Sequence, residues 1–150
     1  MNTDDITKLR QETGAGVMEC RQAFLDARGD YEKAKKFLAQ SAGAIAKKKA
    51  ERATNSGLIA GYVHNGKIGV LVEIACESDF VARNPKFKEM VHNIAMQIAS
   101  MNPKNVEELL GQDFIIDETQ KVKDFINNQV LQIKENIKIK RFVRYELGEE

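Results

Sequence analysis

The sequence predicts an α+β fold, in which a group of helices is followed by a small antiparallel sheet packed with further helices. Apolar residues recur at helical spacing through the first 38 residues, whereas from Gly57 they fall on alternate residues, as in strands. Asn65-Gly66 stands between two such alternating runs and is a strong signal for a hairpin turn. A chain of 150 residues is long enough for one medium-sized domain or two small ones.

Residues 1–38 are expected to form three short helices. Thr3 caps the first helix, and Gly14 occupies the left-handed position that ends it. The second helix covers about residues 16–28, and Asp30 caps the third. Three helices in so short a segment bury only a small core, so we interpret this segment as a recognition module rather than a site of chemistry.

Residues 39–56 are interpreted as a basic, partly helical linker. Lys47-Lys48-Lys49 and Arg52 lie among alanines, and no aromatic side chain is interleaved with them. Such a run is typical of a solvated segment, and the alternative is a contact with nucleic-acid phosphates. Asn55-Ser56-Gly57 has turn chemistry and separates the linker from the core, residues 57–150.

The core is expected to contain three strands, at residues 58–64, 67–77 and 137–147. Asn84-Pro85 is a good N-cap and first turn for a long helix, and two more helices are expected near residues 106–110 and 119–135. One side of the third strand is expected to carry Ile137, Ile139, Val143, Tyr145 and Leu147.

The hairpin turn predicts the pairing of the first two strands, because a two-residue loop places Val63 opposite Ile68. One face of the sheet then carries Ile59, Val63, Ile68, Val70, Val72, Ile74 and Cys76. The opposite face carries Leu58, Ala60, Tyr62 and Leu71. This second face is too apolar to lie comfortably in water, so we expect another surface to cover it.

Charge and motif content narrow the possible functions. The chain has 23 Lys+Arg against 22 Asp+Glu, and this balance argues against a general nucleic-acid binder. The sequence contains no Walker loop, no Gly-x-Gly-x-x-Gly, no Gly-x-Ser-x-Gly and no His-Glu-x-x-His. No residue pattern positively supports a hydrolase or transferase, although none excludes one, and we expect no cofactor and no metal. We interpret His64 and His92 as surface or packing residues.

The expected location is the cytoplasm. Cys20 and Cys76 have no Cys-x-x-Cys spacing and are interpreted as free thiols in a reducing compartment. No apolar run approaches the roughly 18 residues of a membrane span. The N-terminus has neither the basic nor the apolar region of a secretory signal.

The stretch Glu77–Asn84 is the most informative about function, because it lies between a predicted strand and a predicted helix. Side chains at such junctions stand on a rigid rim, where binding residues are often found. From the residues alone, Ser78 or Asp79 caps a helix and Phe80 packs inward.

Three segments resemble the elongation factor Ts family. Ser78–Asn84 (Ser-Asp-Phe-Val-Ala-Arg-Asn) resembles its core motif, and Asn136–Phe142 resembles its closing strand. Leu9–Cys20, with its Thr-Gly-Ala-Gly turn, resembles its opening module, a three-helix unit of the ubiquitin-associated type. Ser78 stands where family members commonly carry Thr. No residues are present for the second core half and the coiled coil of long members, so the chain is similar to the short form.

The resemblance implies a nucleotide-exchange factor that binds the GTPase domain of elongation factor Tu and promotes release of GDP and Mg²⁺. It implies that Phe80 wedges between helices of that domain while Asp79 engages polar groups. The implied partner-binding residues of the motif are Asp79, Phe80, Val81, Ala82, Arg83 and Asn84. Arg83 and Asn84 would brace or flank the motif, and a structural ion pair is an equal alternative for Arg83.

The helical module and the sheet supply further candidates. Val17, Met18 and Arg21 are candidate contacts to the GTPase, with core packing or a solvated face as the alternative. Short members are reported as symmetric dimers, which makes Leu58, Ala60, Tyr62 and Leu71 candidate dimer-interface residues. Two other functions are weighed: an adaptor whose helical module binds a ubiquitin-like or nascent chain, and RNA binding through Lys47-Lys48-Lys49.

Overall fold

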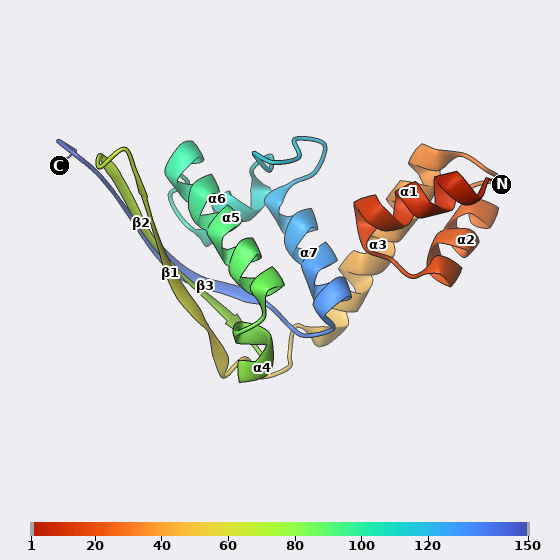
Figure 1. The fold of residues 1–150 in the computed structure, drawn as a ribbon, viewed down its shortest axis with the longest axis horizontal. Helices are drawn as coiled ribbons and strands as arrows, with labels where there is room; N and C mark the ends of the chain where they lie inside the picture. Colours follow the sequence, from red (N-terminus) through yellow and green to blue (C-terminus); the bar gives the residue numbers. More distant parts are fainter. Residues whose placement is uncertain (1, 150) are drawn as a thin grey trace. The chain divides into compact units, whose positions relative to one another are not determined.

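The computed structural model describes residues 2–149, which form two compact units. The helical unit contains the residues up to Glu51 together with Ile126–Glu135, and the sheet unit contains Arg52–Phe125 and the residues from Asn136 onward. Helices precede a three-stranded antiparallel sheet that has helices of its own, so the predicted α+β class is confirmed (Figure 1). The domain boundaries drawn from the sequence stay a prediction.

Helices α1 (Thr3–Thr13), α2 (Val17–Asp26) and α3 (Tyr31–Lys49) form the helical unit with the later part of α7. Asn2, and not Thr3, caps α1, since the Asn2 side chain accepts from the Asp4 amide at 3.2 Å. Gly14 ends α1 at φ 71°, a conformation that glycine adopts without steric cost. Asp30 caps α3 by accepting from the Lys33 amide.

The core of the helical unit is small and made largely of alanines. Its buried members are Leu9, Ala15, Cys20, Ala23, Phe24, Ala27, Ala34 and Leu38, with Ile6, Tyr31 and Leu131 packed against them. Helix α3 continues past the core to Lys49, so the Lys47–Lys49 run forms its last turn. Cations are stabilised there because the end of a helix carries a partial negative charge.

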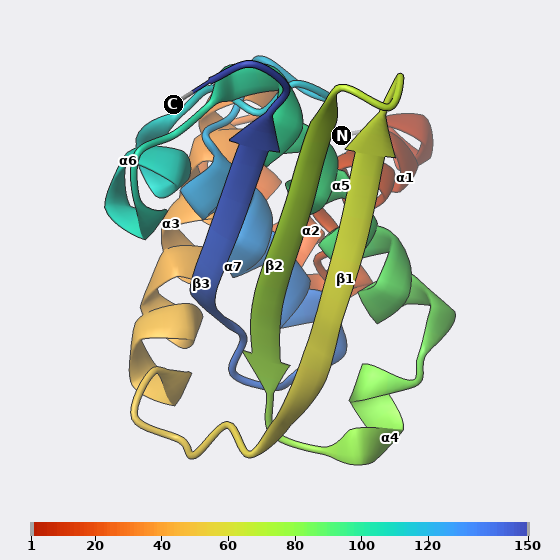
Figure 2. The ribbon, with the colours of Figure 1, turned by 90° about the vertical axis from the view of Figure 1, so that its left-hand side faces the viewer.

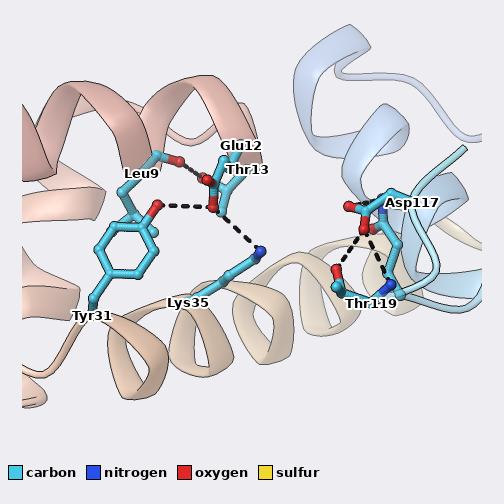
Figure 3. Close-up of polar contacts among 8 residues, drawn as sticks. Leu9, Glu12, Thr13, Tyr31, Lys35, Asp117 and Thr119 are labelled. Carbon is cyan, nitrogen blue, oxygen red and sulfur yellow. Dashed lines mark hydrogen bonds and ion pairs between the residues drawn. The ribbon is translucent and has the colours of Figure 1, made fainter.

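A polar cluster joins α1 to α3 within the helical unit. The Tyr31 hydroxyl donates to the Glu12 carboxylate at 2.8 Å, and the Lys35 ammonium lies 3.3 Å from the same oxygen (Figure 3). The hydrogen bond from Tyr31, helped by Lys35, holds the pKa of Glu12 below its ordinary value of 4.5. Burial, with this hydrogen bond, raises the pKa of Tyr31.

Strands β1 (Ser56–His64), β2 (Ile68–Cys76) and β3 (Lys138–Glu146) form the sheet in the order β1-β2-β3. The predicted hairpin register is wrong by one residue, because His64 pairs with Ile68 across a loop that includes Lys67. Asn65 and Gly66 have the positive φ values of the expected turn. Lys67 stays in the loop, where its carbonyl accepts from the Leu147 amide at 2.7 Å.

The one-residue difference exchanges the two faces of β1, since side chains alternate along a strand. Leu58, Ala60 and Tyr62 pair with Ile74, Val72 and Val70, all buried, and therefore lie on the inner face. Of the four residues predicted on the outer face, only Leu71 is found there. Figure 2 looks onto the outer face of the three strands. The exposed apolar side chains of this face are Ile59, Val63, Leu71, Val143 and Tyr145.

A β-bulge also corrects the prediction for β3. Glu73 pairs with Arg141 and Ile74 with Ile139, which leaves Lys140 as an extra residue. Ile139 is therefore opposite a buried partner, whereas Val143 pairs with the exposed Leu71. The apolar residues of β3 do not share one face.

Helix α5 (Pro85–Met101) covers the inner face of the sheet. Its buried residues are Phe87, Met90, Val91, Ile94, Ala95, Gln97, Ile98 and Ala99. Gln97 is fully buried and accepts from the Ile115 amide at 2.9 Å, while its own amide donates to the Asp113 carbonyl. The Arg144 guanidinium donates to the Ala99 carbonyl and so joins β3 to the end of α5.

Three shorter helices complete the described chain: α4 (Asp79–Ala82), α6 (Val106–Gly111) and α7 (Val122–Ile133). Before α7, the Asp117 carboxylate accepts from the amide and hydroxyl of Thr119 and stabilises the turn (Figure 3). Among residues 2–149, no helix combines the length and apolar character that crossing a bilayer requires.

Tyr31→Phe tests the polar cluster of the helical unit. Phenylalanine keeps the ring contact with Phe24 and removes only the hydroxyl that donates to Glu12. Because the folded-state pKa of Glu12 is lowered, its contribution to stability is complete above pH 4.5 and is lost as the pH falls through the lower folded-state value. We therefore expect wild type to unfold at a higher temperature than the variant at neutral pH. The difference between the two thermal midpoints should become smaller below pH 4.5.

The measurement is the thermal midpoint across that pH range, with the exposed Tyr145→Phe as the matched control. A difference in thermal midpoint between wild type and Tyr31→Phe that does not change with pH would contradict the role of the ionised Glu12 carboxylate as the acceptor of the Tyr31 hydrogen bond.

Asn84→Ala tests the start of α5. The Asn84 side chain accepts from the Lys86 amide at 2.9 Å, and alanine leaves that amide without a partner in the protein. The expected loss is about 1 kcal/mol of the free energy of unfolding. Asn84→Asp keeps an acceptor and should stay close to wild type in urea denaturation; equal losses in both variants would rule out capping as the cause.

Candidate partner-binding site

The site begins where β2 ends. Cys76 is the last residue of β2, and Ser78 then takes an extended conformation and caps α4. Its hydroxyl oxygen accepts from the Val81 amide at 3.3 Å. The predicted cap at Ser78 is confirmed, and it starts a four-residue helix directly after the central strand.

Helix α4 has one buried and one exposed side. Val81 and Ala82 are buried, with Ala82 only 1% exposed, so they fix the helix to the sheet unit. Phe80 is 82% exposed, and the expectation that it packs inward is wrong. An isolated exposed apolar residue is common on protein surfaces. Phe80 differs because its ring stands on a short helix whose other side is immobilised by burial.

Charged and polar residues surround the Phe80 ring. Arg83 forms an ion pair with Asp79 one helical turn earlier, and both side chains are largely exposed. Such a pair contributes little to stability and costs little to break, because water competes for both charges. Asn84 has a structural role as the cap of α5. Together with Pro85, these residues line a hollow of about 570 Å³.

The candidate residues of the helical unit lie outside its core. Met18 is 71% exposed at the start of α2, and Val17 and Arg21 are also exposed. Sequence reasoning missed Leu25, which is exposed on the same helix. Its signal is spacing: Met18, Arg21 and Leu25 follow one another at three and four residues, which places them on one helical stripe.

Neither a metal-ligating cluster nor the two thiols mark a further candidate site among the described residues. Among residues 2–149, no group of three or more His, Cys, Asp or Glu side chains is arranged to hold a metal ion. Cys20 and Cys76 are buried free thiols, and burial raises the pKa of Cys20. The most distinctive exposed features are therefore the ring of Phe80 with its charged neighbours, the α2 stripe and the outer face of the sheet.

Comparison with known proteins gives a consistent result. The family model described as "Elongation factor TS" matches residues 31–108 and 77–150. The elongation factor Ts of Thermotoga neapolitana is 39% identical over 194 aligned positions, which cover 100% of this chain and 98% of the relative. That of Coprothermobacter proteolyticus is 40% identical over 190 positions, covering 96% of each.

A third relative, the elongation factor Ts of Methylacidiphilum infernorum, is 39% identical over 97% of this chain and 94% of its own length. The alignment with the Thermotoga neapolitana protein is longer than the 150 residues of this chain, so that relative contains segments that this chain lacks. The family matches extend from residue 31 to residue 150 and the relatives align over nearly their whole length, and the chain therefore belongs to the elongation factor Ts family.

Proposed function

We propose that this protein is a guanine nucleotide-exchange factor of translation elongation, which binds elongation factor Tu with GDP and promotes release of GDP and Mg²⁺ so that GTP can rebind. Family membership supports this function. The structural observation that carries it is the exposed Phe80 ring on a helix fixed by the buried Val81 and Ala82. As a translation factor the protein acts in the cytoplasm, where ribosomes work.

The proposed activity is coupled binding and not covalent catalysis. A protein that binds the nucleotide-free GTPase more tightly than the GDP-bound form must lower the affinity for GDP by the same factor. No bond is made or broken, and the protein needs no cofactor of its own. What the surface has to supply is a difference in contact energy between the two states of the partner.

Phe80 supplies part of that difference. Burying a phenylalanine contributes roughly 1.5–3 kcal/mol, and each 1.4 kcal/mol changes an affinity about tenfold. A ring that enters the GTPase only when the magnesium side of the site has moved would give this energy to the nucleotide-free state alone. Asp79 stands beside the ring, and its weak pair with Arg83 leaves the carboxylate able to bind polar groups of the partner.

One ring is not sufficient for a large exchange effect, so further contacts must take part. Val17, Met18 and Arg21 on α2 are the proposed contacts of the helical unit, and the exposed Leu25 extends their stripe. Aromatic, methionine and arginine side chains are enriched at protein–protein interfaces, which fits Met18 and Arg21. The basic turn Lys47–Lys49 is not assigned a nucleic-acid contact, since the chain has a net charge of only +1.

We also propose that two copies of the protein associate through the outer face of the sheet. The exposed Ile59, Val63 and Leu71 lie on neighbouring strands, with Val143 and Tyr145 beside them on β3. Two such faces can pack as in a β-sandwich, and each would cover the other. This surface replaces the set predicted from the sequence, of which Leu71 alone remains.

Phe80→Ala tests the exchange function. We expect the variant to keep partial binding to elongation factor Tu and to lose most exchange activity, by more than about tenfold, because truncation removes the contact specific to the nucleotide-free state. The measurement is release of a fluorescent GDP analogue from elongation factor Tu over a range of exchange-factor concentrations.

Ile116→Ala is the matched control, because it truncates another exposed apolar side chain outside the motif. Unchanged GDP release with Phe80→Ala would exclude the wedge role. A folded wild-type protein that does not accelerate release at all would refute the proposed function.

Val63→Lys and Leu71→Lys test the proposed dimer. A charge in the centre of the sheet interface must be desolvated without a partner, so we expect the dimer dissociation constant to rise by at least about tenfold. Sedimentation equilibrium measures that constant, and Ile116→Lys serves as a control at an exposed site off the sheet. A wild-type protein that is monomeric at all concentrations would contradict the dimer.

A further inference from the structure

Three residues of the sheet unit meet directly before the candidate site. The Glu77 carboxylate accepts from the Asn136 backbone amide at 2.5 Å and lies 3.7 Å from the Arg52 guanidinium. The Asn136 side-chain amide donates to the Arg52 carbonyl at 2.9 Å. Asn136 is buried and Glu77 is 23% exposed at its side chain, so water competes poorly for these hydrogen bonds. We call Arg52, Glu77 and Asn136 the Glu77 cluster.

The cluster gathers three segments that are distant in the sequence. Arg52 and Asn136 are the residues at which the chain enters the sheet unit after each of the two segments of the helical unit. Glu77 follows Cys76, the last residue of the central strand. One carboxylate therefore connects the end of the central strand to both entry points of the chain.

The same carboxylate lies at the start of α4. Glu77 precedes Ser78, whose hydroxyl caps α4 and whose carbonyl accepts from the Cys76 thiol at 3.2 Å. Only two residues separate Glu77 from Phe80. At its other end, α4 is followed by Asn84 and Pro85, which begin the long, buried α5. Glu77 on one side and Asn84 with Pro85 on the other therefore flank the short helix that carries the Phe80 ring.

We propose that Glu77 is a positioning residue for Phe80 and Asp79, which keeps α4 in the orientation needed to contact the partner before the partner arrives. The proposal rests on the proposed exchange function. Holding a binding group in its bound orientation removes an entropy cost that would otherwise reduce the binding energy. Loss of Glu77 then weakens the step in which Phe80 is inserted and leaves the contacts of the helical unit intact.

The hydrogen-bond acceptor, rather than the charge, is the part of Glu77 that matters. Arg52 is 54% exposed at its side chain, and ion pairs of exposed groups contribute little. The bond to the Asn136 amide is short and shielded from water, so removing the acceptor leaves a buried backbone amide without that partner. Glu77→Gln keeps a carbonyl oxygen in that place, so it should behave nearly as wild type, whereas Glu77→Ala should not.

The first test needs no partner protein. The chain contains no tryptophan, so Phe80→Trp introduces a single indole fluorophore on the exposed side of α4. Fluorescence anisotropy decay then reports local motion of that side chain on the nanosecond scale. In this background, Glu77→Ala should increase the amplitude of local motion of the indole, whereas Glu77→Gln should leave the amplitude unchanged. The control places the tryptophan by Tyr145→Trp on β3, where neither variant should change the decay.

The second test measures function in a double-mutant cycle. At saturating exchange factor, Glu77→Ala should slow GDP release from elongation factor Tu by about tenfold, the effect of losing one shielded hydrogen bond. In a Phe80→Ala background the same change should have almost no effect, since there is no ring left to position. In a double variant that combines Glu77→Ala with Met18→Ala in the helical unit, the factors by which the two substitutions slow GDP release should multiply.

The outcomes distinguish failure of the positioning role of Glu77 from failure of the proposed exchange function. If Glu77 only stabilised the fold, the slowing of GDP release by Glu77→Ala would multiply with that by Phe80→Ala. The motion of the α4 indole would then also be unchanged in folded protein. Either result overturns the proposal. If wild type does not accelerate GDP release, the exchange function fails, and the anisotropy experiment still decides whether Glu77 orders α4. If Glu77→Ala does not fold, Glu77→Asp keeps the charge but withdraws the carboxylate from the Asn136 backbone amide, and increased motion of the indole is again required.

Discussion

Burial of α5 against the inner face of the sheet is the interaction on which the rest of the sheet unit depends. Val70, Val72 and Ile74 of the central strand are buried, and the apolar face of α5 supplies the matching layer. Each fully buried side chain of this kind contributes roughly 1.5–3 kcal/mol, far more than any surface ion pair in the molecule. This layer fixes the end of β2 and the beginning of α5, and α4 is the short connection between those two fixed points.

The packing of α5 on the sheet also buries a few polar side chains, which must then form hydrogen bonds within the protein. Gln97 sits on the buried side of α5, where an amide without partners would be costly, and it bonds to the backbone of the loop at Asp113 and Ile115. Arg144 lies on the inner face of β3 and reaches the carbonyl of Ala99 near the end of α5. Both side chains connect backbone groups that the helix and the strands leave unpaired. Specific orientation in this unit therefore comes from a few buried polar contacts placed within an apolar layer.

Local signals in the sequence predicted the class, the order of the elements and most of the helix ends, because caps and turns are determined by neighbouring residues. The hairpin register was not predictable from Asn65-Gly66, since Lys67 is held by Leu147 at the far end of the chain. The bulge at Lys140 likewise depends on pairing between strands. The site was only partly predictable: the cap at Ser78 is local, but the exposure of Phe80 depends on which side of α4 is buried. The hydrophobicity of phenylalanine alone predicts that Phe80 is buried.

The division of α4 into a buried and an exposed side has a consequence for how the motif can vary. Successive side chains of an α-helix are rotated by about 100° around its axis. The direction of the Phe80 ring is therefore determined by the number of residues that separate Phe80 from Ser78 and from Ala82. Ala82 occupies a place with no room to spare, and an inserted or deleted residue would rotate the ring toward the sheet and push a neighbour into solvent. The segment can exchange exposed side chains without moving the Phe80 ring, but it cannot change length.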